Sequence, residues 1–184
     1  EGRLTLCNMS VEFSAKYGFV APDEVTFLYL KGRSYAPQGD AWDAAVTYWT
    51  SLRSDAAAVF DAEVVIDVSA LRPQVTWGTS PQHVCAIDQC VPDPSEERDP
   101  QARSEAARAL EYMQLQPGQS LAGLAIDVAY IGSCTNARLS DLRAAADILH
   151  GKRVKPGVQA LCIPGSTPVK RAAEAEGLDQ VFKD

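Results

Sequence analysis

Apolar residues along this chain recur with two different periods, and the change of period predicts where helices and strands lie. Helical spacing marks 24–30, 41–53, 101–113, 140–150 and 168–176, whereas alternating or continuous apolar runs predict strands at 59–68, 124–131 and 158–163. Helix boundaries agree with this division, because Pro22, Asp23 and Glu24 form a typical helix start and Gly32 and Gly177 follow predicted helices. Near the N-terminus, Gly18 is predicted to end a further helix.

The order of these elements predicts the fold class. In the C-terminal third, strand, helix, strand and helix follow one another, which is typical of a parallel sheet covered by helices, and we expect the two strands to be neighbours. Residues 71–99 are dense in Pro, Gly, Thr and Asp, which predicts a long loop that is either functional or a linker with an exposed junction near its end. The prediction is an α/β protein with a mainly parallel sheet. One unit covers residues 1–115, and a second begins within residues 116–184.

The turn after the first of these two strands carries the most reactive side chain. The run YIGSCTN (130–136) follows an apolar stretch and precedes a helix, so Cys134 should lie on a tight turn before the helix N-terminus. Unpaired N–H groups and the positive end of the helix dipole favour a thiolate there. A thiolate on a polar turn is a nucleophile or a metal ligand. The alternative is a buried structural cysteine.

A second turn falls at the same predicted edge of the sheet. The run PGST (164–167) joins the second strand to the last helix, and ligands of such sheets bind beyond the carboxyl ends of the strands. Backbone N–H groups at the start of that helix fit an anion. A plain strand-to-helix turn is the other interpretation.

Composition excludes several classes of protein. The 184 residues are 46% apolar and 22% charged with net charge −7, as in ordinary globular proteins, and basic residues are scattered, which argues against nucleic-acid binding. No apolar run approaches the ~18 residues of a membrane span. The five cysteines are odd in number and lack Cys-x-x-Cys spacing, which predicts reduced thiols in a cytoplasmic compartment. His83 and His150 are far apart in sequence, so we expect no histidine-based zinc site.

Five motifs in order resemble the aconitase superfamily. YIGSCTN (130–136) resembles its first cluster-ligand motif, and NMSVE (8–12) resembles its Asn-Met-x-x-Glu pattern. APDEVTF (21–27), QVTWGTSP (74–81) and PGVQA with PGS (156–166) narrow the resemblance to the large subunits of the isopropylmalate dehydratases, over essentially all 184 residues. The chain starts at Glu1 without an initiator Met and stops just after a helix pattern, so we expect a fragment of a larger multidomain protein.

The resemblance implies a 4Fe-4S cluster held by three cysteines, with one iron left open for substrate and water. Cys134 matches the first ligand, and the family's other two lie in a Cys-x-x-Cys beyond Asp184. Glu12 matches the acidic residue that handles water or hydroxyl at the iron, and Asn8 matches a polar residue beside the cluster. Without the family pattern, Glu12 would be interpreted as a solvated carboxylate on a helix face. Ala137 departs from the pattern, because relatives often carry Ser there.

The implied activity is that of a hydro-lyase that interconverts 2-isopropylmalate and 3-isopropylmalate by dehydration and rehydration, in leucine biosynthesis. The implied partners are a separate small (swivel) subunit and a hydroxy-dicarboxylate substrate, and the implied active site lies between the two units. One alternative is a related isomerase acting on homoaconitate, citraconate/methylmalate or citrate; another is a thiol-nucleophile enzyme with a base near Cys134. A third is a catalytically silent scaffold fragment. With one cluster ligand of three, we expect the 184 residues alone to hold no stable cluster and to be inactive.

Overall fold

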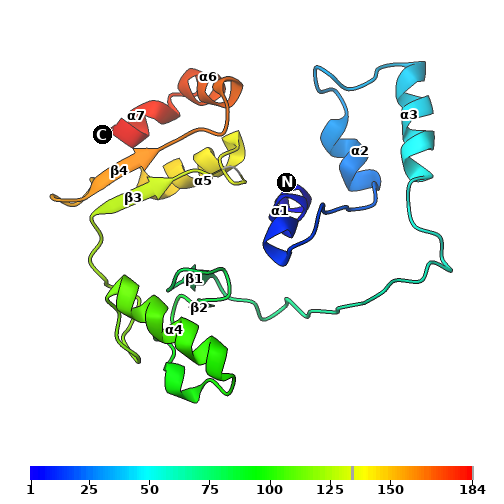
Figure 1. Ribbon diagram of the computed structural model, residues 1–184. Coiled ribbons are helices and arrows are strands. Elements are labelled where there is room, and N and C mark those ends of the chain that lie inside the picture. Colours follow the sequence, from blue (N-terminus) through cyan, green and yellow to red (C-terminus); the bar gives the residue numbers. More distant parts are fainter. Residues whose placement is uncertain (134, 184) are drawn as a thin grey trace. The chain divides into compact units, whose positions relative to one another are not determined.

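The computed structural model describes residues 1–133 and 135–183 (Figure 1). Its elements are α1 (Gly2–Asn8), the 3₁₀ helix η1 (Met9–Phe13), α2 (Glu24–Leu30), α3 (Asp40–Thr50), β1 (Gln74–Thr76), β2 (Val84–Ala86), the 3₁₀ helix η2 (Pro94–Glu96), α4 (Pro100–Met113), β3 (Val128–Ile131), α5 (Leu139–Leu149), β4 (Gln159–Cys162), α6 (Thr167–Ala175) and α7 (Leu178–Lys183). Helices and strands are mixed and one strand pair is parallel, which confirms the α/β class.

The described chain forms two compact units, Glu1–Ile66 and Asp67–Asp184. The sequence predicted a domain boundary near residue 115. That boundary is distinct from the one between these two units, and it stays a prediction. Among the described residues, all the buried apolar side chains belong to the second unit. The first unit therefore has no buried apolar core of its own.

The first unit begins with three helices whose ends follow local signals. Asp23 caps α2, because its carboxylate accepts the backbone N–H groups of Val25 at 3.0 Å and Thr26 at 3.2 Å. Nη2 of Arg3 donates to Oδ2 of the same carboxylate at 2.7 Å, which ties α1 to α2 and holds the pKa of Asp23 well below its usual range. Gly32, with φ +79°, follows the end of α2 as predicted.

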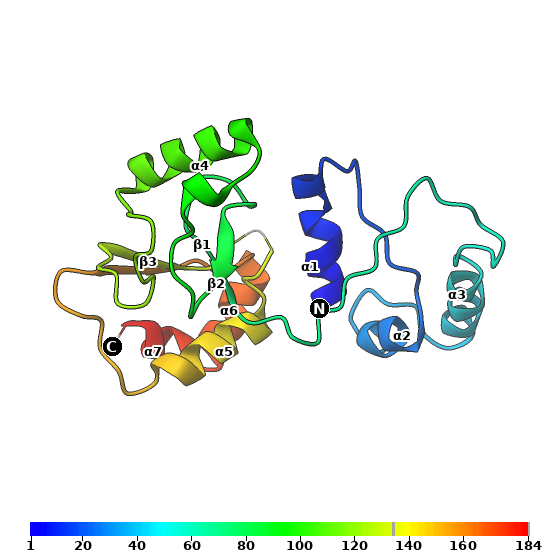
Figure 2. The ribbon, with the colours of Figure 1, turned by 90° about the horizontal axis from the view of Figure 1, so that it is seen from below.

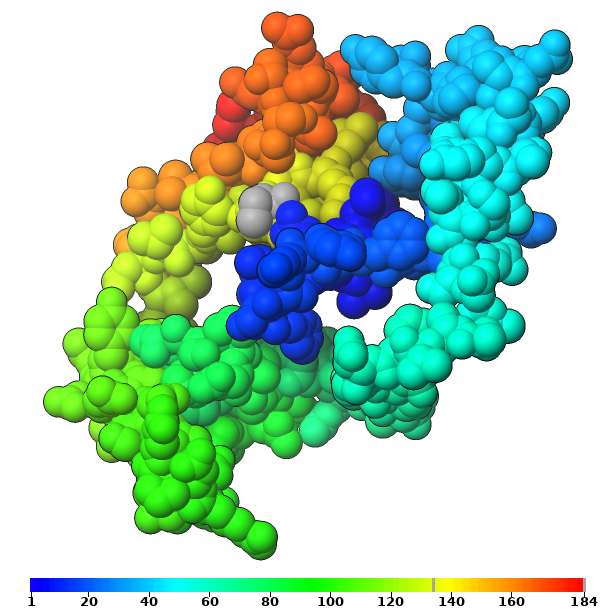
Figure 3. All heavy atoms as spheres, turned by 45° about the vertical axis from the view of Figure 1, so that its right-hand side comes forward, coloured from blue at the N-terminus to red at the C-terminus, as the bar shows by residue number. Residues whose placement is uncertain are grey.

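Aromatic rings join α2 to α3. Phe27 stacks on Trp49 with 6.0 Å between ring centroids, and Trp42 meets Trp49 edge to face at 5.7 Å. In the space-filling view, the light-blue and cyan atoms of α2 and α3 form one continuous body (Figure 3). The helical spacing of the two tryptophans thus marks a packing contact.

Two predictions for the first unit are wrong. Residues 59–68 form no strand, and side chains there are open to solvent, with Val59 95% and Val65 96% exposed. A strand needs a partner for its backbone hydrogen bonds, and no described segment pairs with this one. The helical stretch of α1 and η1 ends at Phe13, followed by Ser14 with φ +61°, rather than at Gly18. Gly18 instead lies against the preceding helix, since a Cβ there would be 1.9 Å from Oγ of Ser10.

Residues 71–99 are not one long loop, which corrects the prediction for this stretch. β1 pairs antiparallel with β2 from Gln74↔Ala86 to Thr76↔Val84. The hairpin contributes Trp77 and Cys85 to a cluster that Leu110 completes from α4. The three-residue strands are held by this contact with a helix that begins only later in the sequence.

The remaining elements form a parallel pair backed by helices. β3 and β4 pair from Val128↔Gln159 to Ile131↔Cys162, as predicted for neighbouring strands, although β3 is shorter than expected. Figure 2 shows α5, α6 and α7 on one side of this pair. Leu142 of α5 is 1% exposed and is one of the most deeply buried large side chains of the described residues.

Candidate functional site

Two turns meet where β3 and β4 end. The parallel register brings Ile131 opposite Cys162, so the segments that begin at Gly132 and at Ile163 leave the sheet at the same edge. Cys134 itself lies outside the described residues. Its neighbours are ordered by Ser133, whose Oγ accepts the N–H groups of Asn136 at 2.9 Å and Thr135 at 3.2 Å. The turn therefore has its own hydrogen-bonded frame on both sides of Cys134.

The two turns pack against one another backbone to backbone. Gly132 has φ +117°, and a Cβ there would lie 2.2 Å from the carbonyl oxygen of Ile163. Gly165 donates its N–H to the carbonyl of Ala137 at 2.9 Å, and a Cβ on Gly165 would lie 2.9 Å from that oxygen. No side chain fits between the turns at these two points, which explains the glycines of both motifs.

Polar groups gather at the start of α5. The N–H of Arg138 donates to Oδ2 of Asp141 at 3.0 Å, so an acidic side chain occupies the positive end of the helix. Nη1 of Arg138 donates to Oδ1 of Asn136 at 3.2 Å. At the second turn, Ser166 caps α6 by accepting the N–H of Val169 at 3.3 Å. That capping bond favours the plain-turn interpretation of 164–167 over a bound anion.

The other two predicted site residues lie in the first unit. Asn8 is the last residue of α1, and Glu12 follows it in η1; both are exposed. Within the described part of the chain, no hydrogen bond or ion pair engages the Glu12 carboxylate. Because Glu12 and the turn around Cys134 belong to different units, their meeting in one site stays a prediction.

The described cysteines do not form a metal centre. Cys7, Cys85, Cys90 and Cys162 are free thiols, and burial raises the pKa of the Cys85 and Cys162 thiols. A raised pKa keeps a thiol protonated at neutral pH, and the protonated thiol is a poor ligand and nucleophile. Among the described residues, no group of three His, Cys, Asp or Glu side chains is placed to hold a metal ion. Cys134, the cysteine that the family resemblance assigns to a cluster, lies outside the residues to which this statement applies.

Comparisons with known proteins give the family. The family model described as "Aconitase family (aconitate hydratase)" matches residues 1–184. The 3-isopropylmalate dehydratase large subunit 1 of Bradyrhizobium diazoefficiens is 58% identical over all 184 residues, which span 39% of that relative. The 3-isopropylmalate dehydratase large subunit of Cupriavidus necator is 59% identical over the same residues, which span 69% of it. No helix in the described part of the chain is long and apolar enough to cross a membrane. The chain belongs to the aconitase family.

Proposed function

We propose that the whole protein of which these residues form part is a hydro-lyase that interconverts 2-isopropylmalate and 3-isopropylmalate, a step of leucine biosynthesis. The observation that carries the proposal is the identity of 58% and 59%, over the full 184 residues, with two proteins named as large subunits of 3-isopropylmalate dehydratase. A large subunit implies a small one, so we propose a heterodimer with a small (swivel) subunit. The reduced thiols expected from the sequence favour the cytoplasm.

The roles of this chain's residues follow from their chemistry. A bound 4Fe-4S cluster would supply a Lewis acid toward the substrate hydroxyl and carboxylate. Cys134 would provide one thiolate ligand. Since no Cys-x-x-Cys occurs in the 184 residues, the remaining ligands would come from outside them. We assign Asn8 to a polar position beside the cluster. We assign Glu12 to proton transfer at its carboxylate, as a general acid–base group.

The packing of the two turns supports the assignment of Cys134. A metal ligand must be held in a fixed direction, and neighbouring hydrogen bonds serve that purpose. Here Oγ of Ser133 binds two backbone N–H groups of the turn, and Gly165 fixes Ala137 from the neighbouring turn. The same geometry also suits a nucleophilic cysteine. The test must therefore separate a ligand from a nucleophile.

The experiment uses the whole protein with its small subunit, reconstituted with iron and sulfide under anaerobic conditions. We expect turnover of 2-isopropylmalate in preference to homoaconitate, citraconate and citrate. Cys134→Ser should abolish both the visible iron–sulfur absorption and turnover, whereas Cys90→Ser, at an exposed position, should retain both. Glu12→Gln should retain the absorption and lower turnover by about 10²- to 10⁴-fold.

Other outcomes would redirect the assignment. Turnover of another panel member in place of 2-isopropylmalate would make the protein a related isomerase of the same family. A Cys134→Ser protein that keeps its absorption would refute the ligand role. The 184 residues alone should show neither absorption nor turnover, and a stable cluster on them would contradict this expectation.

A further inference from the structure

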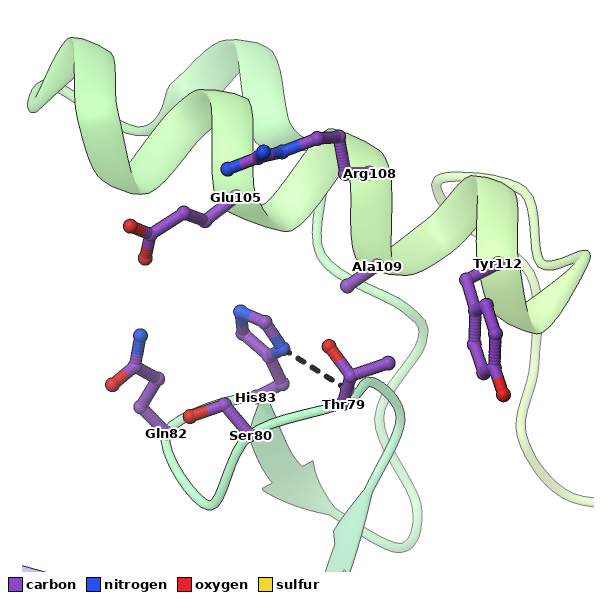
Figure 4. Close-up of a pocket in the computed structure, with 8 residues that line it drawn as sticks. All are labelled: Thr79, Ser80, Gln82, His83, Glu105, Arg108, Ala109 and Tyr112. Atoms are coloured by element: carbon purple, nitrogen blue, oxygen red, sulfur yellow. Dashed lines mark hydrogen bonds between the residues drawn. The ribbon is translucent and has the colours of Figure 1, made fainter.

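A pocket of about 460 Å³ opens between the β1–β2 hairpin and α4, within the second unit (Figure 4). Its floor is the hairpin loop, which carries Ser80 and His83, and its roof is α4, which carries Glu105, Arg108 and Tyr112. Of these residues only Ser80 lies in a motif used for the family resemblance, QVTWGTSP (74–81), and none of them has a role in the proposed function. Sequence reasoning treated His83 only as too distant from the second histidine to make a zinc site.

The imidazole of His83 is fixed in one orientation. It is 7% exposed and stacks on Trp77 with 4.8 Å between ring centroids. Its Nδ1 accepts the backbone N–H of Thr79 at 3.2 Å. Gly78 leaves the room for the ring, since a Cβ at that position would lie 2.5 Å from Nδ1. The stacking on Trp77 and the hydrogen bond from Thr79 therefore hold the ring, and Gly78 leaves the space that it occupies.

This orientation decides where the proton of the neutral imidazole resides. A nitrogen that accepts a hydrogen bond carries no proton, so the proton is on Nε2, which becomes a donor. No described residue accepts a hydrogen bond from Nε2. Figure 4 shows this second nitrogen turned toward α4, into the pocket. A side chain that is 7% exposed thus directs a donor that no described residue engages into the cavity, where a ligand can accept its hydrogen bond.

Two charged side chains of α4, Arg108 and Glu105, also line the pocket. Arg108 faces the same pocket, and no hydrogen bond or ion pair with a described residue engages its guanidinium. The carboxylate of Glu105 already accepts a hydrogen bond from Nε2 of Gln101 at 3.0 Å. The pocket therefore presents two donors that no described residue engages, the guanidinium of Arg108 and the Nε2–H of His83, and an anion complements them.

We propose that this pocket binds a small carboxylate, held by the guanidinium of Arg108 and by the Nε2–H of His83. A carboxylate fits better than a phosphate because Glu105 lies beside the site. A group with a charge near −2 is repelled more strongly by that neighbour than a group with charge −1. The planar fork of arginine matches the two carboxylate oxygens. The proposal does not depend on the proposed function, because Asn8, Glu12 and Cys134 take no part in it.

The test uses the whole protein with histidine labelled in ¹⁵N, so that NMR reads the two ring nitrogens of each histidine. His83→Gln identifies the His83 signals. Lactate, with charge −1, is the probe, its neutral amide lactamide is the uncharged comparison, and inorganic phosphate is the competing anion. The readout is local to His83, so binding of lactate elsewhere in the protein does not register as binding here.

Lactate should shift the His83 signals in a saturable way, lactamide should leave them unchanged, and phosphate should bind more weakly than lactate. Arg108→Gln should weaken lactate binding at least about tenfold, because a charge-assisted hydrogen bond is lost. Arg171→Gln, a matched change on α6 outside the pocket, should bind as the parent does. The proposal fails if lactate leaves His83 unchanged or if lactamide acts equally. It also fails if phosphate binds as tightly as lactate, or if the two arginine variants bind alike.

Discussion

Replacing Gly132 with alanine should destabilise the β3–β4 pair, because the added methyl group has neither an allowed backbone conformation nor room. The residue has φ +117°, which L-residues rarely adopt. The new Cβ would lie 2.2 Å from the carbonyl oxygen of Ile163. The obstacle is backbone, which has no rotamer by which to move aside. Ile163 is itself tied to β3, since its N–H donates to the carbonyl of Ile131 at 2.9 Å.

Two costs add at this position. A residue held in a sparsely populated backbone region costs about 1–3 kcal/mol. An extra methyl group forced into a packed site costs about 1–3 kcal/mol. We therefore expect a loss of about 2–6 kcal/mol in the local free energy of opening of this pair.

Two other glycines separate these costs. Gly157 has φ +93°, and a Cβ added there would meet nothing within 4 Å, so Gly157→Ala should incur only the conformational cost. Gly165 has no positive φ, but its Cβ would lie 2.9 Å from the carbonyl oxygen of Ala137, so Gly165→Ala should incur only the steric cost. Both variants should lose less stability than Gly132→Ala.

Native-state hydrogen exchange, read by mass spectrometry over β3 and β4, measures these losses locally, since a multidomain protein need not unfold in two states. Equal protection in Gly132→Ala and Gly157→Ala would refute the steric part of the reasoning. Full protection in Gly132→Ala would refute both parts.

Three further predictions concern packing, pH and capping. Leu142→Ala should cost about 2–5 kcal/mol by opening a cavity behind the strands, whereas Ile148→Ala, at a 65% exposed position of the same helix, should stay within about 0.5 kcal/mol; denaturant midpoints of the two variants compare them. The pKa of Asp23 is lowered mainly by its hydrogen bond from Arg3, so its contribution is present above the ordinary carboxyl pKa and is lost as pH falls through the lowered value. Asp23→Asn should remove that acid dependence from the helical circular dichroism of the first unit. Ser166→Ala should cost about 1 kcal/mol through loss of the α6 cap, measured as faster exchange in the first turn of that helix.

The helices were predictable because their signals are local. Asp23 and Asp99 each accept backbone N–H donation from the turn that follows, and a glycine with positive φ comes one residue beyond the end of α2 and of α6. These interactions span three or four residues, so the sequence displays both partners side by side. The helix α7 was not predicted, because its six residues are too few to show a period.

The errors lie where a partner is distant in sequence. Residues 64–66 look like a strand, but pairing depends on a second segment that the described chain does not supply. The β1–β2 hairpin looks like a loop, because its three-residue strands are held by contacts from Trp77 to Leu110 of a later helix. Alternation of side chains reports which face is apolar and not whether a partner exists.

Some features of the candidate site could also be predicted from the sequence, and others could not. The strand order predicted that the turns after β3 and β4 share one edge, and the register of the pair confirms it. The contact between Gly132 and Ile163 could not be foreseen, although a glycine directly before Ser133 and Cys134 was a signal of close approach. The fixed orientation of the buried His83 ring left no trace in the sequence beyond Gly78, whose missing side chain makes room for the ring.

The unpaired segment 59–68 also has a colloidal consequence. An extended, solvent-exposed run of β-branched residues is a template for pairing between copies of a chain, and proteins guard such runs with flanking charges. Here Glu63 and Asp67 stand on either side of residues 64–66. Hydrogen bonds from the hydroxyl and the N–H of Ser69 lower the pKa of Asp67. Asp67 therefore keeps its negative charge at lower pH than an ordinary aspartate would. The electrostatic repulsion between copies of the chain at this segment is retained over the same range of pH.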